Sequence, residues 1–145
     1  MNPNMHLDNK KRTIDTVSRV LEHEGFEVKK QFKLGRRFYA DIVGFKDNEA
    51  VLVEVKPIGI RLDQSDLMQV SGYMGALKTN EDFADTRISG CVIASGGTIP
   101  GATSLAGELG IHVVDSDKGE KIEEGIRICI SRLRQRDQTR SRERQ

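Results

Sequence analysis

The stretch Val51-Leu52-Val53-Glu54-Val55-Lys56 decides the fold, because it places two charged residues in the most strongly β-forming segment of the chain. Side chains alternate between the two faces of a strand, so the three valines share one face while Glu54 and Lys56 share the other. Unpaired charges are costly to bury and are usually paired or bound to a metal. The preceding apolar run, residues 38–43, contains Asp41. An Asp and a Glu on adjacent strands, beside a Lys, can hold one divalent cation and one attacking water.

The ordinary alternative for Lys56 is an ion pair with a carboxylate at a sheet edge. A bare Asp-x12-Glu-x-Lys pattern is short, and it arises often by chance. It gains weight here because both carboxylates lie on adjacent predicted strands that are otherwise apolar.

The net charge of +1 over 145 residues hides an uneven distribution. Residues 1–40 hold nine Lys/Arg and five Asp/Glu (+4), residues 41–131 hold eight and fifteen (−7), and residues 132–145 hold six and two (+4). Basic ends around an acidic middle suit a protein that binds a polyanion and concentrates carboxylates at a metal site. A solvated surface with a charged tail explains the same distribution at least as well.

The length suits one domain with a sizeable core. No apolar stretch approaches the ~20 residues that span a bilayer, and the N-terminus lacks the apolar segment of a signal peptide. We therefore expect a cytoplasmic protein. Cys91 and Cys129 lie in apolar runs and are expected to be buried thiols, although one disulfide between them stays open.

Apolar periodicity and turn residues define the expected elements. We expect helices over residues 13–24, 65–78, 101–109 and 120–134, and strands over residues 26–32, 38–45, 50–56, 87–95 and 111–114. Three consecutive strands followed by strand–helix units predict an α/β fold, a mixed central sheet with helices on both faces. Residues 1–10 are expected to be loose. We expect a single domain over residues 1–135 and a disordered basic tail over residues 136–145, which contain no apolar residue.

A second polar group lies on the helix that follows the Glu-x-Lys strand. Gln69 and Tyr73 are four residues apart and therefore share one helix face. The glutamine can position Lys56 or a scissile phosphate, and the tyrosine can order water or contact a nucleic-acid backbone. Taken alone, the pair is better explained by a solvated glutamine and a tyrosine at the edge of the core.

Together these residues resemble the PD-(D/E)xK nuclease superfamily, which has the restriction-endonuclease-like fold. Ala40-Asp41 stands where that pattern has Pro-Asp, residues 54–56 match its (D/E)xK element, and residues 69–73 are similar to the QxxxY element of RecB-type members. The order of elements over residues 53–115 is similar to the nuclease domain of NucS/EndoMS mismatch endonucleases. The opening helix and Gly25-Phe26-Glu27-Val28 resemble the start of archaeal Holliday-junction resolvases.

The resemblance implies a DNA endonuclease that depends on Mg²⁺ or Mn²⁺. It implies that Asp41 and Glu54 bind the cation, with the carbonyl of Val55 as a third ligand. It also implies that Lys56 orients the attacking water or stabilises developing charge, with Gln69 positioned to assist. A first-helix acid would bring a second cation; the candidates are Asp15, which lies closest to the usual position in the family, Glu22 and Glu24, with His23 weaker still. Each of them is more readily explained as a solvated helix residue.

Arg36 and Arg37 precede Asp41 and can grip DNA phosphates, with Tyr73 as a further contact; an exposed hairpin explains the two arginines equally well. A chain of this size has little surface for reading sequence. We therefore expect structure-selective cleavage at junctions, flaps or mismatches in DNA repair or recombination, or else restriction. Expected partners are DNA, a second copy of the chain, and a motor or clamp protein. The alternative functions are a non-catalytic nucleic-acid-binding module and a nuclease subunit that works only with a partner.

Overall fold

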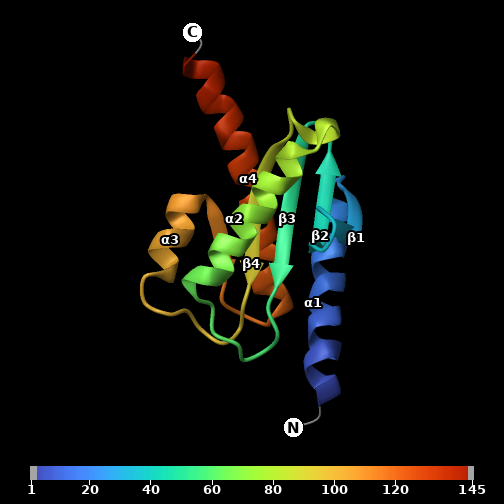
Figure 1. Ribbon diagram of the computed structural model, residues 1–145, viewed down its shortest axis with the longest axis vertical. Helices are drawn as coiled ribbons and strands as arrows, with labels where there is room; N and C mark the ends of the chain where they lie inside the picture. Colours follow the sequence, from blue (N-terminus) through green and yellow to red (C-terminus); the bar gives the residue numbers. More distant parts are fainter. Residues whose placement is uncertain (1–2, 144–145) are drawn as a thin grey trace.

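A five-stranded sheet lies between two pairs of helices in the computed structural model, which describes the backbone of residues 3–143 and the side chains of residues 8–135 (Figure 1). The helices are α1 (Pro3–His23), α2 (Gln64–Thr79), α3 (Ala102–Leu109) and α4 (Gly119–Glu143), with a 3₁₀ turn η1 (Glu81–Phe83). The strands are β1 (Glu27–Lys33), β2 (Tyr39–Lys46), β3 (Glu49–Val55), β4 (Arg87–Ile93) and β5 (Ile111–Val114). The expected order of elements is confirmed.

The sheet is mixed, and its spatial order, β1-β2-β3-β4-β5, follows the sequence. The first three strands pair antiparallel, whereas β3, β4 and β5 run parallel. A parallel neighbour requires a crossover connection, and α2 and α3 provide the two crossovers. The predicted meander followed by crossover units is therefore confirmed.

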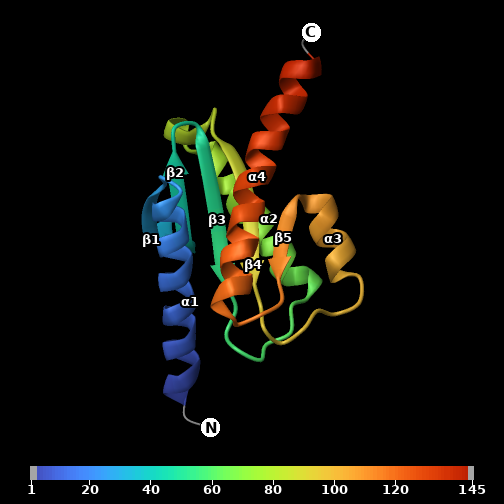
Figure 2. The same cartoon turned by 180° about the vertical axis from the view of Figure 1, so that it is seen from behind.

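Each face of the sheet is covered by one pair of helices. Helices α2 and α3 lie in front of the sheet in Figure 1, and α1 and α4 lie in front in the reverse view of Figure 2. The three valines of β3 pack into the core on the α1/α4 side, and Leu52 between them packs into the core under α2 and α3. The predicted alternation along β3 is confirmed, and it fixes Glu54 on the α2 side because that residue is two positions from Leu52.

Both terminal helices are longer than the sequence suggests. Helix α1 begins at Pro3, so the expectation of a loose segment is wrong for residues 3–10. Proline fits the first turn of a helix because its missing N–H would have no partner there. Helix α4 runs to Glu143, through most of the segment for which composition predicts a disordered tail. The side chains of residues 136–145 lie outside the described part, so the division into a 1–135 domain and a separate tail stays a prediction.

Two further expectations concern the core and the membrane. Cys91 and Cys129 are both buried and free, which confirms the expected buried thiols. Among residues 3–143, no helix is long and apolar enough to cross a bilayer.

Two helical glycines offer a matched test of the packing. At Gly75 in α2 a Cβ would meet open space, whereas at Gly125 in α4 it would clash with Cγ2 of Val114 in β5. Alanine is favoured over glycine in a helix by about 0.8–1.0 kcal/mol. We expect Gly75→Ala to raise the free energy of unfolding by up to about 1 kcal/mol. Gly125→Ala should lower it by about 1–3 kcal/mol, because overpacking outweighs propensity. Urea denaturation measures both changes, and an equal gain in the two variants would contradict the packing of α4 against β5.

Candidate active site

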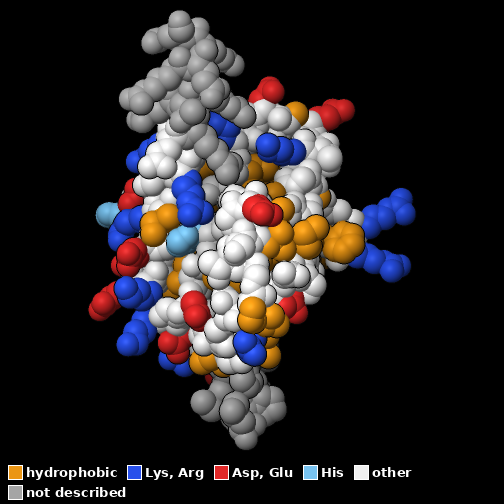
Figure 3. All heavy atoms as spheres, turned by 90° about the vertical axis from the view of Figure 1, so that its left-hand side faces the viewer, with side chains coloured by type: hydrophobic (Ala, Val, Ile, Leu, Met, Phe, Trp, Pro, Cys, Tyr) orange, Lys and Arg blue, Asp and Glu red, His pale blue; other side chains and the backbone are white. Residues whose placement is uncertain are grey.

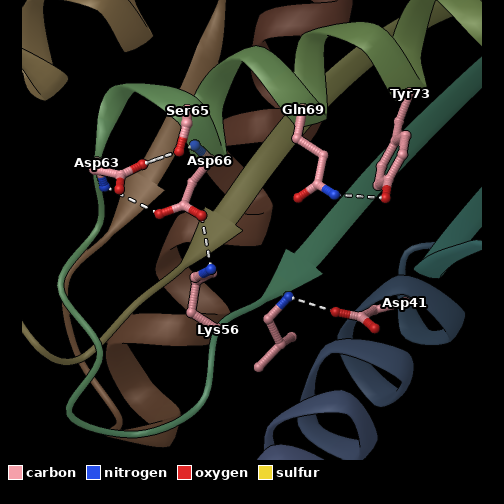
Figure 4. A network of polar contacts seen from close by, with 8 residues as sticks. Asp41, Lys56, Asp63, Ser65, Asp66, Gln69 and Tyr73 are labelled. Atoms are coloured by element: carbon pink, nitrogen blue, oxygen red, sulfur yellow. Dashed lines mark hydrogen bonds and ion pairs between the residues drawn. The ribbon is translucent and has the colours of Figure 1, made fainter.

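Asp41 and Glu54 meet where β2 and β3 stop pairing. The backbone ladder between the two strands ends at the pair Ile42–Val53. One residue further, the N–H of Asp41 donates to Oε1 of Glu54 at 2.9 Å. The N–H of Val55 donates to Oδ2 of Asp41 at 2.8 Å (Figure 4). Each carboxylate thus satisfies a backbone donor of the other strand, and the two side chains replace the next rung of the sheet.

The two carboxylates repel each other in a poorly solvated place. Asp41 is 6% exposed. The pKa of Glu54 is raised to about 8, first because burial penalises its charged form and then because the charge of Asp41 lies beside it. The hydrogen bond from the Asp41 N–H and the charge of Lys10 oppose this rise without cancelling it. Burial and the neighbouring charge therefore favour the neutral, protonated form of Glu54 at neutral pH.

Two residues that the sequence analysis did not single out contact Asp41. Nζ of Lys10, in α1, lies 3.2 Å from Oδ1 of this carboxylate. Nε2 of Gln31, in β1, donates to the same oxygen at 3.4 Å. The φ angle of Gln31 is 49°, in the left-handed region that non-glycine residues seldom adopt.

The regular alternation of side chains breaks around Gln31. Val28 packs against the core on the α1/α4 side, but Phe32, four residues along the same strand, packs on the α2/α3 side. In β2, Ile42 packs on the α1/α4 side, whereas Ala40, two residues away, packs on the α2/α3 side. Residues two or four apart in a regular strand share a face, so both strands twist locally at this point. Asp41 lies within that twist.

Lys56 lies just beyond β3 and faces α2. Its Nζ is 2.7 Å from Oδ1 of Asp66, and its N–H donates to the carbonyl of Ile93 at 2.9 Å (Figure 4). Asp66 is itself held by a capping box at the start of α2: its other oxygen accepts the N–H of Asp63, and Asp63 in turn accepts the N–H of Asp66, both at 3.0 Å. An ion pair, the ordinary alternative for Lys56, is therefore present, and the catalytic role of this lysine stays a prediction.

Gln69 and Tyr73 point from α2 toward the sheet (Figure 4). Nε2 of Gln69 lies 2.9 Å from the Tyr73 hydroxyl, which accepts its hydrogen bond. The pKa of Tyr73 is raised, first by burial and then by the negative charges of Glu54 and Asp41. The tyrosine therefore lies near the carboxylate pair, and the two helix residues share one face as expected.

The three acidic candidates from the expected first helix, of which Glu24 lies just after the end of α1, have other partners. Asp15 is 3.0 Å from Lys30, and Glu24 is 3.6 Å from Arg127. Glu22 accepts a hydrogen bond from Ser18 at 3.4 Å. Within residues 8–135, no cluster of three or more His, Cys, Asp and Glu side chains could hold a metal ion. The described side chains thus offer two carboxylates at this place and no third.

A basic hollow of about 370 Å³ opens beside Asp41, between α1 and β1. Lys10, Lys11 and Lys30 line it together with two acids, Asp41, which pairs with Lys10, and Asp15, which pairs with Lys30. Arg36 and Arg37 are exposed in the turn between β1 and β2. Positive charge therefore borders the carboxylate pair from the first helix, and further positive charge stands at the hairpin.

The donor set fits a hard divalent cation. Mg²⁺ and Mn²⁺ prefer oxygen ligands, and Mg²⁺ is commonly held by one or two carboxylates while it keeps several waters. Asp41 and Glu54 supply two carboxylates at one place. Burial and then the charge of Asp41 raise the pKa of Glu54, and a bound cation would favour the ionised form that both effects oppose.

No protein-family model matches the chain, and no curated protein sequence resembles it significantly. Solved structures do. A repair endonuclease from Pyrococcus abyssi has a TM-score of 0.55 and 24% identity, over 78% of this chain and 46% of that chain. EndoMS in complex with double-stranded DNA has a TM-score of 0.54 and 17% identity, over 73% and 42%. A protein of unknown function has a TM-score of 0.53 and 19% identity, over 70% and 56%.

The fold is therefore the α/β fold of restriction-endonuclease-like proteins, as the sequence predicts. Within that class, the predicted resemblance to NucS/EndoMS is confirmed for the fold. The chain spans about half the length of these structures, or somewhat less.

The raised pKa of Glu54 should make the stability of the metal-free protein depend on pH. Between the unfolded value of 4.5 and the folded value of about 8, the folded state binds more protons. This carboxyl therefore lowers the free energy of unfolding as pH rises, by up to about 1.4 kcal/mol per pH unit. Glu54→Gln removes the titration, so its stability relative to wild type should increase steadily from pH 5 to pH 8.

Urea denaturation in EDTA at several pH values measures this difference. The comparison with wild type matters because His112, whose pKa is lowered by burial, contributes the opposite slope in both proteins. Glu108→Gln, an exposed change on α3, serves as the control and should track wild type. A constant difference between Glu54→Gln and wild type would contradict the raised pKa.

The Lys56–Asp66 contact can be measured with a double-mutant cycle. Asp66→Asn keeps an oxygen for the N–H of Asp63 and removes the charge facing Lys56. We expect Lys56→Met and Asp66→Asn to couple by about 1 kcal/mol in the free energy of unfolding, because both side chains are largely buried. Asp63→Asn is the matched control: it neutralises the other capping-box acid, retains a good N-cap, and should not couple with Lys56→Met. Strict additivity in both cycles would rule the ion pair out.

Proposed function

We propose that the protein is a DNA endonuclease that hydrolyses phosphodiester bonds with Mg²⁺ or Mn²⁺. One observation carries the proposal: two carboxylates are held together, poorly solvated, at the separating ends of β2 and β3. Such a pair destabilises the fold unless a proton or a cation neutralises part of its charge. A bound divalent cation accounts for the arrangement, and the basic hollow beside Asp41 provides for a phosphate.

Asp41 and Glu54 would hold the cation, with the carbonyl of Val55 as a third ligand. When bound, the cation would supply Lewis-acid chemistry that activates water and neutralises charge on the phosphate. The protein residues do the rest. Lys56, held by Asp66, would stabilise negative charge that develops on the scissile phosphate.

The remaining polar residues would position the substrate. Gln69, fixed by its hydrogen bond to Tyr73, would orient the attacking water or the phosphate. Tyr73 would contact the DNA backbone. Lys10 would place a second ammonium group on the α1 side of the phosphate, next to Asp41.

DNA is the proposed partner because basic residues border the site and stand on the hairpin next to it. Arg36 and Arg37 would contact phosphates from the hairpin, and the lysine-lined hollow would contact them from α1. One structure with this fold, EndoMS, contains double-stranded DNA. We propose that the enzyme selects DNA structures such as junctions, flaps or mismatches, either alone, as a homodimer, or with a motor or clamp protein.

A second candidate is a nucleic-acid-binding module without chemistry, or a subunit that needs a partner to cut. Lys10 favours it, because its ammonium group already supplies one positive charge to Asp41 without a metal. Mn²⁺ titration separates the candidates. A nuclease should gain thermal stability in wild type and lose that gain in Glu54→Gln, whereas a pure binder should show no Mn²⁺-dependent change in either.

Cleavage of labelled linear, nicked, mismatched, flapped and four-way-junction DNA tests the proposal directly. We expect wild type to cut with Mg²⁺ or Mn²⁺ and not with EDTA. Asp41→Asn, Glu54→Gln and Lys56→Ala should each lower the rate by about 10²-fold or more, because each removes a group that acts on the reacting phosphate. Glu108→Gln should cut like wild type. If folded wild type binds DNA and cuts none of these substrates under any condition, the non-catalytic or partner-dependent alternative is correct.

A further inference from the structure

Phe38 is the exposed exception among the phenylalanines. It leaves 57% of its surface in solvent, and its ring centroid lies 6.2 Å from that of Tyr73. The other four are packed: Phe26 in the core, and Phe32, Phe45 and Phe83 in a cluster of rings. The ring of Phe38 adds nothing to the core, and its exposed surface on the projecting turn is free to contact a ligand.

The position of Phe38 links the hairpin to the carboxylate pair. Its carbonyl accepts the N–H of Leu34 at 2.8 Å, which closes the turn that carries Arg36 and Arg37. Tyr39, next along the chain, is 46% exposed. The hairpin therefore presents two guanidinium groups and two aromatic rings side by side in the sequence. Figure 3 shows hydrophobic side chains that reach an edge of the molecule where basic side chains project.

The aromatic path continues inward from Phe38. Its neighbour Tyr73 lies close enough to Glu54 and Asp41 for their charges to raise the tyrosine pKa. One ring thus separates Phe38 from the proposed reaction centre. A nucleotide whose base contacts Phe38 would lie on the side of Tyr73 that leads to the carboxylate pair.

We propose that Phe38, with Tyr39 beside it, is a stacking platform for an unpaired nucleobase, and that it selects DNA with an unstacked nucleotide beside the cleaved bond. The inference rests on the proposed function for its ligand, DNA. A flat ring with adjacent guanidinium groups matches a base and its phosphates, since aromatic stacking and backbone charge are the two contacts that single-stranded DNA offers. In a paired duplex both faces of a base are covered, so the ring reaches a base only where stacking is interrupted.

Charge favours DNA over a second copy of the chain as the ligand of the hairpin. A two-fold interface through the hairpin would bring the same patch of both copies together. Arg36 and Arg37 of one copy would then face those of the other, and like charges across an interface oppose association. The same arginines favour a polyanion.

Fluorescence anisotropy in EDTA, with DNA carrying one unpaired 2-aminopurine or the same strand fully paired, measures the preference without cleavage. Phe38→Ala should weaken binding of the unpaired DNA by about tenfold, as expected for loss of one stacked base, and binding of paired DNA by less than twofold. Phe38→Trp should restore the preference. The quenching of 2-aminopurine on binding should disappear in Phe38→Ala and return in Phe38→Trp.

Two controls accompany this variant. Ile99→Ala removes another exposed apolar side chain, 37% exposed, from the loop that precedes α3, and it should change neither affinity. Arg36→Ala with Arg37→Ala should weaken both DNAs alike and reduce the dependence of binding on salt, because phosphate contacts carry no structure preference.

Three results would overturn the stacking role: an equal loss for both DNAs in Phe38→Ala, no loss for either, or a wild-type dimer that Phe38→Ala converts to a monomer. The outcomes also separate this inference from the proposed function. Selective binding that depends on Phe38, in a protein that cuts nothing, supports the stacking role and rejects the nuclease. DNA cleavage whose substrate preference is unchanged in Phe38→Ala supports the nuclease and rejects the stacking role.

Discussion

The repulsion between Asp41 and Glu54 is the constraint on which the rest of the site depends. Two carboxylates at the ends of neighbouring strands cannot both ionise in a poorly solvated place without compensation. The structure compensates locally: each carboxylate accepts the backbone N–H that would otherwise lack a partner on the opposite strand. One backbone pair between β2 and β3 is missing from the sheet, and the two carboxylates lie close together where the strands separate.

The fold follows from the sequence because its apolar runs are short, β-branched and separated by turn residues. The alternation along β3 assigns its three valines to one core and Leu52 to the other, and the structure agrees. The helix expected over residues 65–78 is also present as α2, and Asp63 caps its N-terminus. The start of helix α1 is harder to predict, because its first residues are mostly polar and show no helical apolar periodicity. Composition alone predicts a loose segment over residues 3–10, which form the first turns of this helix.

The site follows from the sequence only in part. Asp41, Glu54, Gln69 and Tyr73 come together because strand and helix periods bring them to one place. The contacts of Lys10 and Gln31 with Asp41 depend on how α1 packs and on a left-handed φ in β1, and neither has a local signature. The capping box was a readable signal, since Asp-x-x-Asp opens α2. The sequence does not indicate where the side chain of Lys56 points. In the tertiary structure it points toward Asp66 of that capping box.

The charges near the carboxylate pair bear on the proposed chemistry. Asp41 and Glu54, the ammonium groups of Lys10 and Lys56, and Asp66, which is paired with Lys56 on α2, together carry a net charge of −1 when all are ionised. In the metal-free protein Glu54 keeps its proton at neutral pH, because burial first and the charge of Asp41 second raise its pKa to about 8. A divalent cation in place of that proton would bring the sum to +1, complementary to the single negative charge of a phosphodiester. Under the proposed function, Lys10 and Lys56 would therefore act together with a divalent cation, because the cation would give the cluster the positive charge that attracts a phosphate.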